Sequence, residues 1–219
     1  MGKTILSFAG GDVQPVIAIF AGGDAPPRSV LEQVPPDAFV IGADSGLDHA
    51  RALGRGVDLL VGDLDSVSAE GLSVATDVRR YPADKDETDL ALALEAAAQM
   101  SPIRVIVVGG AGGRIDHLLA NAALLCRSEY RDFQITWLPG RATIYVVHGR
   151  LDLEGSPGDL VSLLPYGGPA TGISTDGLRW PLAAATLEPG ATVGVSNEMR
   201  EVTATVSVTD GTLLVIHIP

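Results

Sequence analysis

The stretch from Val57 to Ser66 reads Val-Asp-Leu-Leu-Val-Gly-Asp-Leu-Asp-Ser, and it indicates the fold of the first half of the chain. The apolar run 59–61 has the length and composition of a buried strand in an α/β sheet. The run stops at Gly62, and Asp63 and Asp65 follow with one residue between them. Residues i and i+2 of an extended segment point to the same side. We therefore expect both carboxylates to project beyond the carboxyl end of the strand, where ligands of such sheets bind.

Two carboxylates held this close favour a cation between them. One interpretation is therefore a Mg²⁺ site that binds a polyphosphate. The alternative is a polar loop in which Asp65 or Ser66 caps the next helix. This stretch alone leaves both interpretations open.

Composition limits the class of protein. The chain has 219 residues, enough for one large or two small domains, and its 46% hydrophobic and 19% charged residues predict a packed core. A net charge of −12 argues against nucleic acid and anionic membranes as partners, although metal ions can bridge an acidic protein to a nucleotide. Cys126 is the single cysteine, so no disulfide forms within the chain. No apolar run reaches the ~18 residues of a membrane span, and we expect a soluble cytoplasmic protein.

The first half alternates strand and helix patterns, which predicts a mostly parallel α/β sheet of the three-layer, Rossmann-like kind. The expected strands are 16–20, 38–43, 59–61, 78–81, 103–108 and 133–138, and the expected helices are 29–34, 47–53, 88–100 and 116–127.

The pattern changes near Pro139-Gly140. The later residues show short alternating strands, and Asp210-Gly211 between two of them predicts a hairpin. This half therefore indicates an antiparallel β-sandwich or barrel, with the domain boundary at about 140, giving domains 1–140 and 141–219. The expected strands are 143–148, 159–164, 192–195, 202–208 and 212–217.

Acidic residues gather after the predicted strands. Thirteen of the 27 acidic residues lie between Asp44 and Asp116, whereas solvated surface acids usually scatter along a chain. Asp44 follows one strand directly, and Asp89 lies at a helix start, where it can also favour the helix dipole. Because such positions share one edge of a parallel sheet, the cluster favours a metal–phosphate site.

The glycine-rich run 109–113 lies between a strand and a helix and ends at Arg114. Backbone N–H groups in such a loop, the helix N-terminus and the arginine can bind an anion, although a tight turn with a surface arginine would show the same letters. His117 and Asn121 lie four residues apart on the helix. They either reach a base or ribose or are ordinary surface residues.

Two tryptophans mark the end of the first half and the middle of the second. Trp137 ends a buried strand and is expected in the core. Trp180 is either a core residue or an aromatic platform for a flat cationic ring, and the residues alone favour the core.

The motifs together resemble the thiamin pyrophosphokinase family, over the chain from about residue 16 onward. They occur in the family's order and span both predicted domains. They are Ala43-Asp44-Ser45-Gly46, Gly62-Asp63-Leu64-Asp65-Ser66, Asp84-Lys85-Asp86-Glu87-Thr88-Asp89, Gly112-Gly113-Arg114-Ile115-Asp116-His117, Gly172-Ile173-Ser174-Thr175-Asp176-Gly177-Leu178, Trp180-Pro181-Leu182, Ser196-Asn197-Glu198 and Asp210-Gly211-Thr212-Leu213-Leu214.

The resemblance implies an α/β catalytic domain, a C-terminal β-sandwich and a homodimer with active sites at the subunit interface. It implies transfer of a pyrophosphoryl group from ATP to thiamin, with release of AMP. Asp63, Asp65 and Asp89 would hold Mg²⁺, Asp44 and Asp116 would complete the acidic cluster, and Lys85 and Arg114 would bind phosphate oxygens. The implied nucleotide contacts are Asp44, Ser45, Gly46, Thr88, Gly110, Gly113, Arg114, His117 and Asn121. The implied thiamin contacts are Trp180, Ser196 and Asn197.

One residue departs from the family pattern, which usually has a second glycine where this chain has Ser45. A serine there would be strained if its φ were positive. The segment from Met1 to Gln14 lies outside the shared pattern. The competing functions are a pyrophosphokinase for another alcohol, such as a hydroxymethylpterin, and a non-catalytic thiamin-binding protein.

Overall fold

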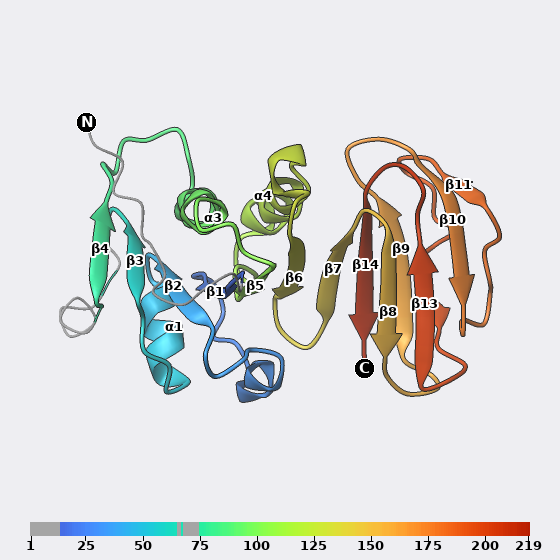
Figure 1. Ribbon diagram of the computed structural model, residues 1–219, viewed down its shortest axis with the longest axis horizontal. Helices are drawn as coiled ribbons and strands as arrows, with labels where there is room; N and C mark the ends of the chain where they lie inside the picture. The colour runs from blue at the N-terminus through green and yellow to red at the C-terminus, as the bar shows by residue number, and fades with distance from the viewer. Residues whose placement is uncertain (1–13, 65–66, 68–74) are drawn as a thin grey trace. The chain divides into compact units, whose positions relative to one another are not determined.

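A computed structural model describes residues 14–64, 67 and 75–219 (Figure 1). The chain divides into two compact units, residues 1–118 and 119–219. The division falls inside a helix, so the functional boundary expected near residue 140 stays a prediction. In the described part of the chain, no helix has the length and apolar composition needed to cross a membrane.

The first unit contains a five-stranded parallel sheet. Its order is β5-β1-β2-β3-β4, and every neighbouring pair is parallel. The run 59–61 forms the first three residues of β3, whose four residues are all buried, as a strand covered on both faces requires. The strands are β1 (Val16–Phe20), β2 (Phe39–Ala43), β3 (Leu59–Gly62), β4 (Asp77–Arg80) and β5 (Arg104–Val108).

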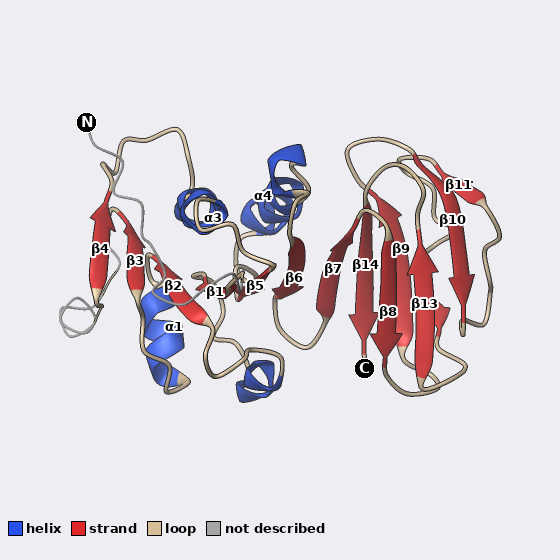
Figure 2. Cartoon of the chain, viewed as in Figure 1, coloured by secondary structure: helices blue, strands red, loops and turns tan. Residues whose placement is uncertain are grey.

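Helices cover both faces of this sheet, which confirms the three-layer expectation. Helix α1 (Gly46–Ala52) contacts β1 and β2, and α3 (Asp89–Ala98) contacts β1, β2 and β3 from the opposite side (Figure 2). Helix α4 (Ile115–Leu125) follows β5, and η2 (Ser128–Tyr130) is a short 3₁₀ turn. The helix expected at 29–34 is instead the 3₁₀ helix η1 (Arg28–Glu32).

The strand order reverses direction between β1 and β5. The chain runs outward from β1 through β2 and β3 to β4, then returns through α3 to β5 on the other side of β1. In open α/β sheets, ligands bind outside the carboxyl ends of the strands at this switch point. The loops after β1 and β5 therefore flank the expected site.

The second unit is an antiparallel β-sandwich, which settles the choice between sandwich and barrel. One sheet has the order β12-β9-β14-β7-β6 and the other β11-β10-β13-β8, with a shared core of buried aliphatic side chains between them. The strands are β6 (Gln134–Leu138), β7 (Thr143–Val147), β8 (Arg150–Glu154), β9 (Leu160–Pro165), β10 (Ala170–Asp176), β11 (Ala185–Leu187), β12 (Asn197–Glu198), β13 (Thr203–Ser207) and β14 (Leu213–Ile218).

Two expectations for this half are wrong. Residues 193–196 form a turn instead of the strand expected at 192–195. Asp210-Gly211 does not close a hairpin, because β13 pairs with β8 and β10 whereas β14 pairs with β7 and β9. The strand expected at 133–138 forms as β6, which pairs antiparallel with β7 because their connection is too short for a parallel crossover.

Candidate active site

Backbone contacts bring the carboxyl ends of four strands together at one edge of the parallel sheet. The amide of Asp44 donates to the carbonyl of Val61 at 2.8 Å, and the amide of Gly110 donates to the carbonyl of Gly22 at 2.8 Å. A Cβ atom on Gly46 would overlap the carbonyl of Phe20, so glycine is needed where α1 begins against β1. The residues after β1, β2, β3 and β5 therefore share one edge.

The centre of the site is Lys85, which binds two of the predicted aspartates. Its ammonium lies 3.3 Å from Asp63 Oδ2 and 3.0 Å from Asp89 Oδ1. The three side chains are only 13%, 18% and 28% exposed, respectively. Burial alone lowers the pKa of Lys85, but the hydrogen bonds and charges of Asp89 and Asp63 outweigh it and raise the pKa above its ordinary value. Lys85 is therefore a fixed cation at neutral pH.

Asp44 adjoins this triad through Gly62. A Cβ atom on Gly62, whose φ is +151°, would lie 3.1 Å from Asp89 Oδ1 and 3.3 Å from the Cα of Asp44. Acidic residues from the end of β2, the end of β3 and the start of α3 thus converge, as the sequence predicted. Asp65 lies outside the described residues, so its place in the cluster stays a prediction.

The loop after β2 has its unusual backbone at Asp44 and not at Ser45. Asp44 has a φ of +48°, whereas Ser45 has a φ of −58°. A Cβ atom on Gly22 would lie 2.5 Å from Ser45 Oγ, so the serine hydroxyl packs over the loop after β1. The serine therefore adds no backbone strain, and aspartate is among the residues that tolerate the left-handed region.

The site residues fit a divalent cation by chemistry, because carboxylate oxygens are the ligands that Mg²⁺ prefers. In the described residues, which exclude Asp65, no group of three acidic, histidine or cysteine side chains is placed to hold a metal ion. Lys85 instead provides the positive charge that Asp63 and Asp89 share. These two carboxylates are the described candidates for metal ligands.

The glycine loop after β5 carries a second ion pair. Arg114 Nε donates to Asp116 Oδ1 at 3.1 Å, and both side chains are exposed. The guanidinium lowers the pKa of Asp116 to about 2, and Asp116 in turn raises the pKa of Arg114. This pair lies at the solvent-exposed start of α4, where a phosphate could displace Asp116 and bind the guanidinium of Arg114.

The remaining predicted nucleotide contacts have different surroundings. Thr88 caps α3, because its Oγ1 accepts from the amide of Ala91 at 3.2 Å. Gly110 and Gly113 both have positive φ. His117 is exposed, whereas Asn121 is 7% exposed, so the two residues on one helix face differ in access to solvent.

The predicted thiamin residues form a polar cluster in the second unit. Trp180 is 52% exposed, so the expectation from its residues alone, a core position, is wrong; Trp137 is 1% exposed and its core position is confirmed. The Asn197 side chain accepts from the Trp180 amide at 3.1 Å and donates to the Trp180 carbonyl at 2.7 Å. Ser196 has a φ of +59°, and its amide donates to Ser162 Oγ at 3.0 Å.

Sequence reasoning missed two features of these sites. Asp24 lies against the glycine loop: its amide donates to the Ala111 carbonyl at 2.8 Å, and a Cβ atom on Gly112 would overlap its carboxylate. Its position after β1 and two glycines was a usable signal. Arg179 stacks on Trp180 with its guanidinium carbon 4.8 Å from the ring centroid, a contact that sequence cannot show.

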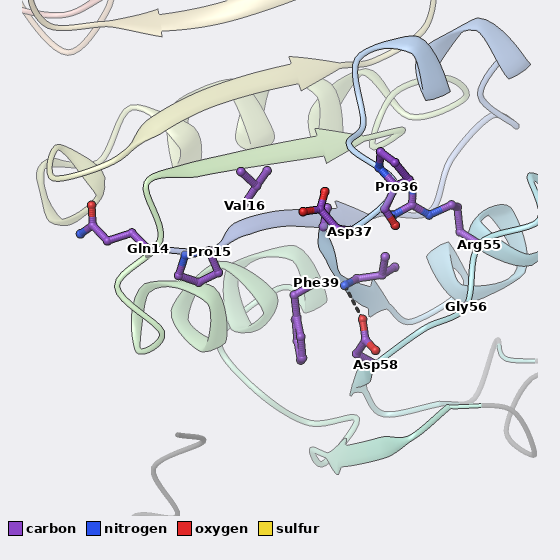
Figure 3. Close-up of a pocket in the computed structure, with 11 residues that line it drawn as sticks. Gln14, Pro15, Val16, Pro36, Asp37, Phe39, Arg55, Gly56 and Asp58 are labelled. Atoms are coloured by element: carbon purple, nitrogen blue, oxygen red, sulfur yellow. Dashed lines mark hydrogen bonds between the residues drawn. The ribbon is translucent and has the colours of Figure 1, made fainter. Parts of the chain in front are cut away.

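A separate pocket of about 570 Å³ lies at the amino ends of β1 and β2 (Figure 3). Arg55 donates to the carbonyl of Pro35 at 2.9 Å beside it, and Asp58 accepts from the amide of Val40 at 2.8 Å. The pocket is therefore at the opposite end of the strands from the acidic cluster.

Comparisons with known proteins agree with this architecture. A family model described as thiamin pyrophosphokinase, catalytic domain, matches residues 32–137, and one described as thiamin pyrophosphokinase, vitamin B1 binding domain, matches residues 148–213. The two matches follow each other along the chain and leave residues 138–147 between them.

Individual relatives point the same way. Thiamine pyrophosphokinase from Bacillus subtilis is 29% identical over 162 residues, which are 71% of this chain and 76% of the relative. Thiamine pyrophosphokinase 1 from Oryza sativa subsp. japonica is 26% identical over 68% of this chain, and the match spans 62% of that relative.

Solved structures extend the likeness to the fold. The crystal structure of the Bacillus subtilis enzyme has a TM-score of 0.82 at 26% identity, covering 93% of this chain and 98% of that one. A thiamin pyrophosphokinase family protein from Enterococcus faecalis has a TM-score of 0.78 at 26% identity, covering 94% and 99%. Two domain models of the same family match the chain in succession, and the relatives carry that family's name. The chain therefore belongs to the thiamin pyrophosphokinase family.

Proposed function

We propose that this chain transfers the pyrophosphoryl group of ATP to thiamin, giving thiamin diphosphate and AMP. The observation that carries the proposal is the Lys85 triad with Asp63 and Asp89, set at the carboxyl edge of the sheet within the match to the family's catalytic domain. The hydroxyl oxygen of thiamin attacks the β-phosphorus, the bond from that phosphorus to the bridging oxygen of AMP breaks, and the hydroxyl proton passes to a base.

The acidic cluster has a metal-binding role in this proposal. Asp63, Asp65 and Asp89 would hold Mg²⁺, with Asp44 beside them. When bound, the ion neutralises the phosphate oxygens and makes the β-phosphorus more electrophilic. Lys85 already lies within ion-pair distance of two of these carboxylates, so it is positioned to contact an oxygen of a phosphate bound there. Such a reaction depends on alignment and charge neutralisation more than on covalent help.

The nucleotide occupies the loops at the switch point in this proposal. Its phosphates face the glycine loop, where Arg114 leaves Asp116 to bind them. The proton acceptor in this proposal is Asp44 or Asp116, the two carboxylates of the cluster that are not assigned to the metal. The contacts assigned to the nucleotide are Asp44, Ser45, Gly46, Thr88, Gly110, Gly113, Arg114, His117 and Asn121.

The second half of the chain binds thiamin in this proposal. We assign residues 1–140 to catalysis and residues 141–219 to thiamin binding and dimerisation, with Trp180, Ser196 and Asn197 at the thiamin site. The protein acts as a homodimer in the cytoplasm. The match of residues 148–213 to a vitamin B1 binding domain and the exposed ring of Trp180 support this assignment.

Product analysis tests the function directly. The protein is incubated with ATP, Mg²⁺ and thiamin, and AMP and thiamin diphosphate are separated and quantified. Formation of both products in equal amounts is expected. Formation of AMP with a hydroxymethylpterin but not with thiamin would replace the substrate, and tight thiamin binding without AMP release would replace catalysis by binding.

A further inference from the structure

Trp180 offers a flat ring with two unequal faces. The Arg179 guanidinium carbon lies 4.8 Å from the ring centroid, which is within the range of a cation–π contact. A guanidinium at this position covers one face of the ring. Trp180 is nevertheless 52% exposed, so much of its surface stays accessible to solvent with Arg179 in place.

Arg179 is held in this position by Glu198. Arg179 Nη1 lies 2.7 Å from Glu198 Oε2, and the Arg179 amide donates to the Glu198 carbonyl at 2.8 Å. An isolated β-bridge between Leu178 and Met199 lies alongside. The exposed ion pair would contribute little by itself, but the backbone contacts fix both residues side by side before any ligand arrives.

The ring itself is held by Asn197. This side chain is 4% exposed, and its amide makes contacts with both the N–H and the carbonyl of Trp180 while also accepting from the Glu198 amide at 2.9 Å. The Asn197 amide is therefore engaged in holding Trp180, and it acts as a positioning residue for the ring instead of a direct contact to a ligand.

We infer that Trp180 is a one-sided stacking platform, in which Arg179 closes one face and so selects the face on which a flat, positively charged ring binds. This inference rests on the proposed function for the identity of that ring, thiamin. A second cation is repelled from the face that carries the guanidinium, whereas the opposite face offers the ring's negative potential without that repulsion. Glu198 fixes Arg179 and offsets its charge.

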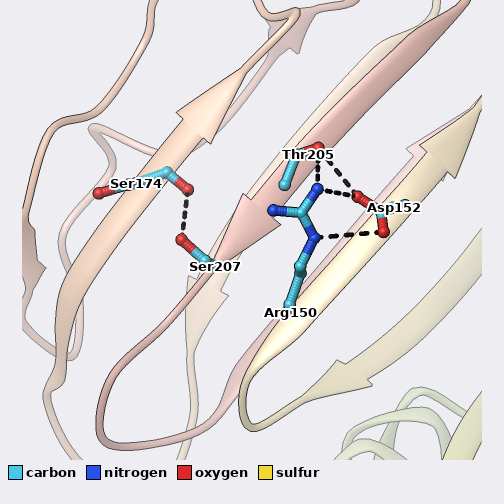
Figure 4. A network of polar contacts seen from close by, with 5 residues as sticks. All are labelled: Arg150, Asp152, Ser174, Thr205 and Ser207. Carbon is cyan, nitrogen blue, oxygen red and sulfur yellow. Dashed lines mark hydrogen bonds and ion pairs between the residues drawn. The ribbon is translucent and has the colours of Figure 1, made fainter.

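The same unit offers a matched control. Arg150 and Asp152 form an exposed pair at 2.7 Å on the second sheet, where Thr205 also contacts both (Figure 4). This pair has the ion-pair distance of Arg179 and Glu198, and its third partner is the hydroxyl of Thr205. Arg150→Met therefore removes a comparable exposed pair without uncovering a tryptophan.

Acrylamide quenching of tryptophan fluorescence tests the covered face without any assumption about catalysis. Trp180→Phe reports the background of the buried Trp137. In Arg179→Met we expect the quenching constant of Trp180 to rise roughly twofold, because the second face of the ring is freed from the cation–π contact. Arg179→Lys should restore much of the protection, and Arg150→Met should match the wild type. An Arg179→Met protein that is quenched no more than the wild type would overturn the inference.

Acrylamide quenching in the presence of thiamin then tests which face of Trp180 the thiamin ring covers. Saturating thiamin should reduce quenching of the wild type to the Trp180→Phe level, and should protect Arg179→Met only in part, because one face stays open.

Arg179→Met should also lower kcat and KM together, since thiamin on the freed face is bound but not aligned. Equal protection of both proteins, or a raised KM with unchanged kcat, would overturn the inference. Absence of AMP formation in the wild type would remove the proposed function, while the acrylamide result would still decide whether Arg179 covers the ring.

Discussion

Lys85→Met removes the cation that Asp63 and Asp89 share and keeps an unbranched side chain of similar length. The two carboxylates are 18% and 28% exposed, so the loss leaves two partly buried negative charges without that partner. In the proposed reaction the substitution also removes a positive charge from the phosphate site. It should therefore lower both stability and turnover.

The distances set the scale of the effect. With ion pairs of 3.0 and 3.3 Å, the direct attraction is about 10 kcal/mol at an effective dielectric constant of about 20, before desolvation is subtracted. Desolvation offsets most of this attraction, and we expect a net loss of about 1–3 kcal/mol in the free energy of unfolding, between the values typical of exposed and of fully buried pairs. We expect turnover to fall by about 100-fold, or about 2.7 kcal/mol in the activation free energy.

Denaturant unfolding and steady-state kinetics measure the two effects. The control is Arg51→Met, since Arg51 pairs with Asp48 at 3.8 Å on α1 and its side chain is 35% exposed. The raised pKa of Lys85 means that its pairing stabilises the fold below the unfolded value of about 10.4, and this stabilisation is lost as the pH rises through the higher folded value. The stability difference from the wild type should therefore shrink above that pH. A Lys85→Met protein with wild-type turnover and unfolding free energy would refute the reasoning.

Three further predictions concern single residues. Asp65→Asn should lower turnover at least tenfold, or about 1.4 kcal/mol, with an unchanged circular dichroism spectrum; wild-type turnover in the folded variant would exclude Asp65 as a metal ligand. Burial raises the pKa of Cys126 to about 12, so at pH 8 its reaction with Ellman's reagent should be at least ~100-fold slower in the native protein than in urea, and equal rates would show that the thiol is not buried. The Ser156 amide and then His217 lower the pKa of Asp159, so its stabilisation is present above about pH 3.9 and is lost as the pH falls through the lower folded value. The melting temperatures of wild type and Asp159→Asn should converge in acid, and a gap that widens there would contradict this assignment.

The sequence predicts most of the first unit because its signals are local. The run 59–61 is apolar throughout, Thr88 precedes an alanine- and leucine-rich helix, and both become the expected elements. Strand β8 was missed although Arg150–Glu154 alternates charged and apolar residues, because the segment is short and is flanked by glycine- and proline-containing turns. Its strand conformation comes from pairing with β13, which is distant along the chain.

The candidate site was predicted as a set of residues but not as a set of contacts. Spacing placed Asp63 and Asp89 at one edge of a sheet, yet only the folded chain shows that Lys85 binds both. The core position expected for Trp180 was wrong. The expectation followed from the rule that a large aromatic residue in a β-rich segment usually packs in a core. Its exposure depends on Asn197, which holds the backbone of Trp180 from a separate segment of the chain.

The position of β14 has a consequence for synthesis on the ribosome. This strand lies between β7 and β9, although it comes after both along the chain. Until residues 213–218 have left the exit tunnel, β7 and β9 each present an unpaired edge that can pair with other chains. The five parallel strands of the first unit are complete by residue 108 and can form earlier. Ribosome stalling before residue 213 should therefore produce nascent chains with a structured first half and an aggregation-prone second half.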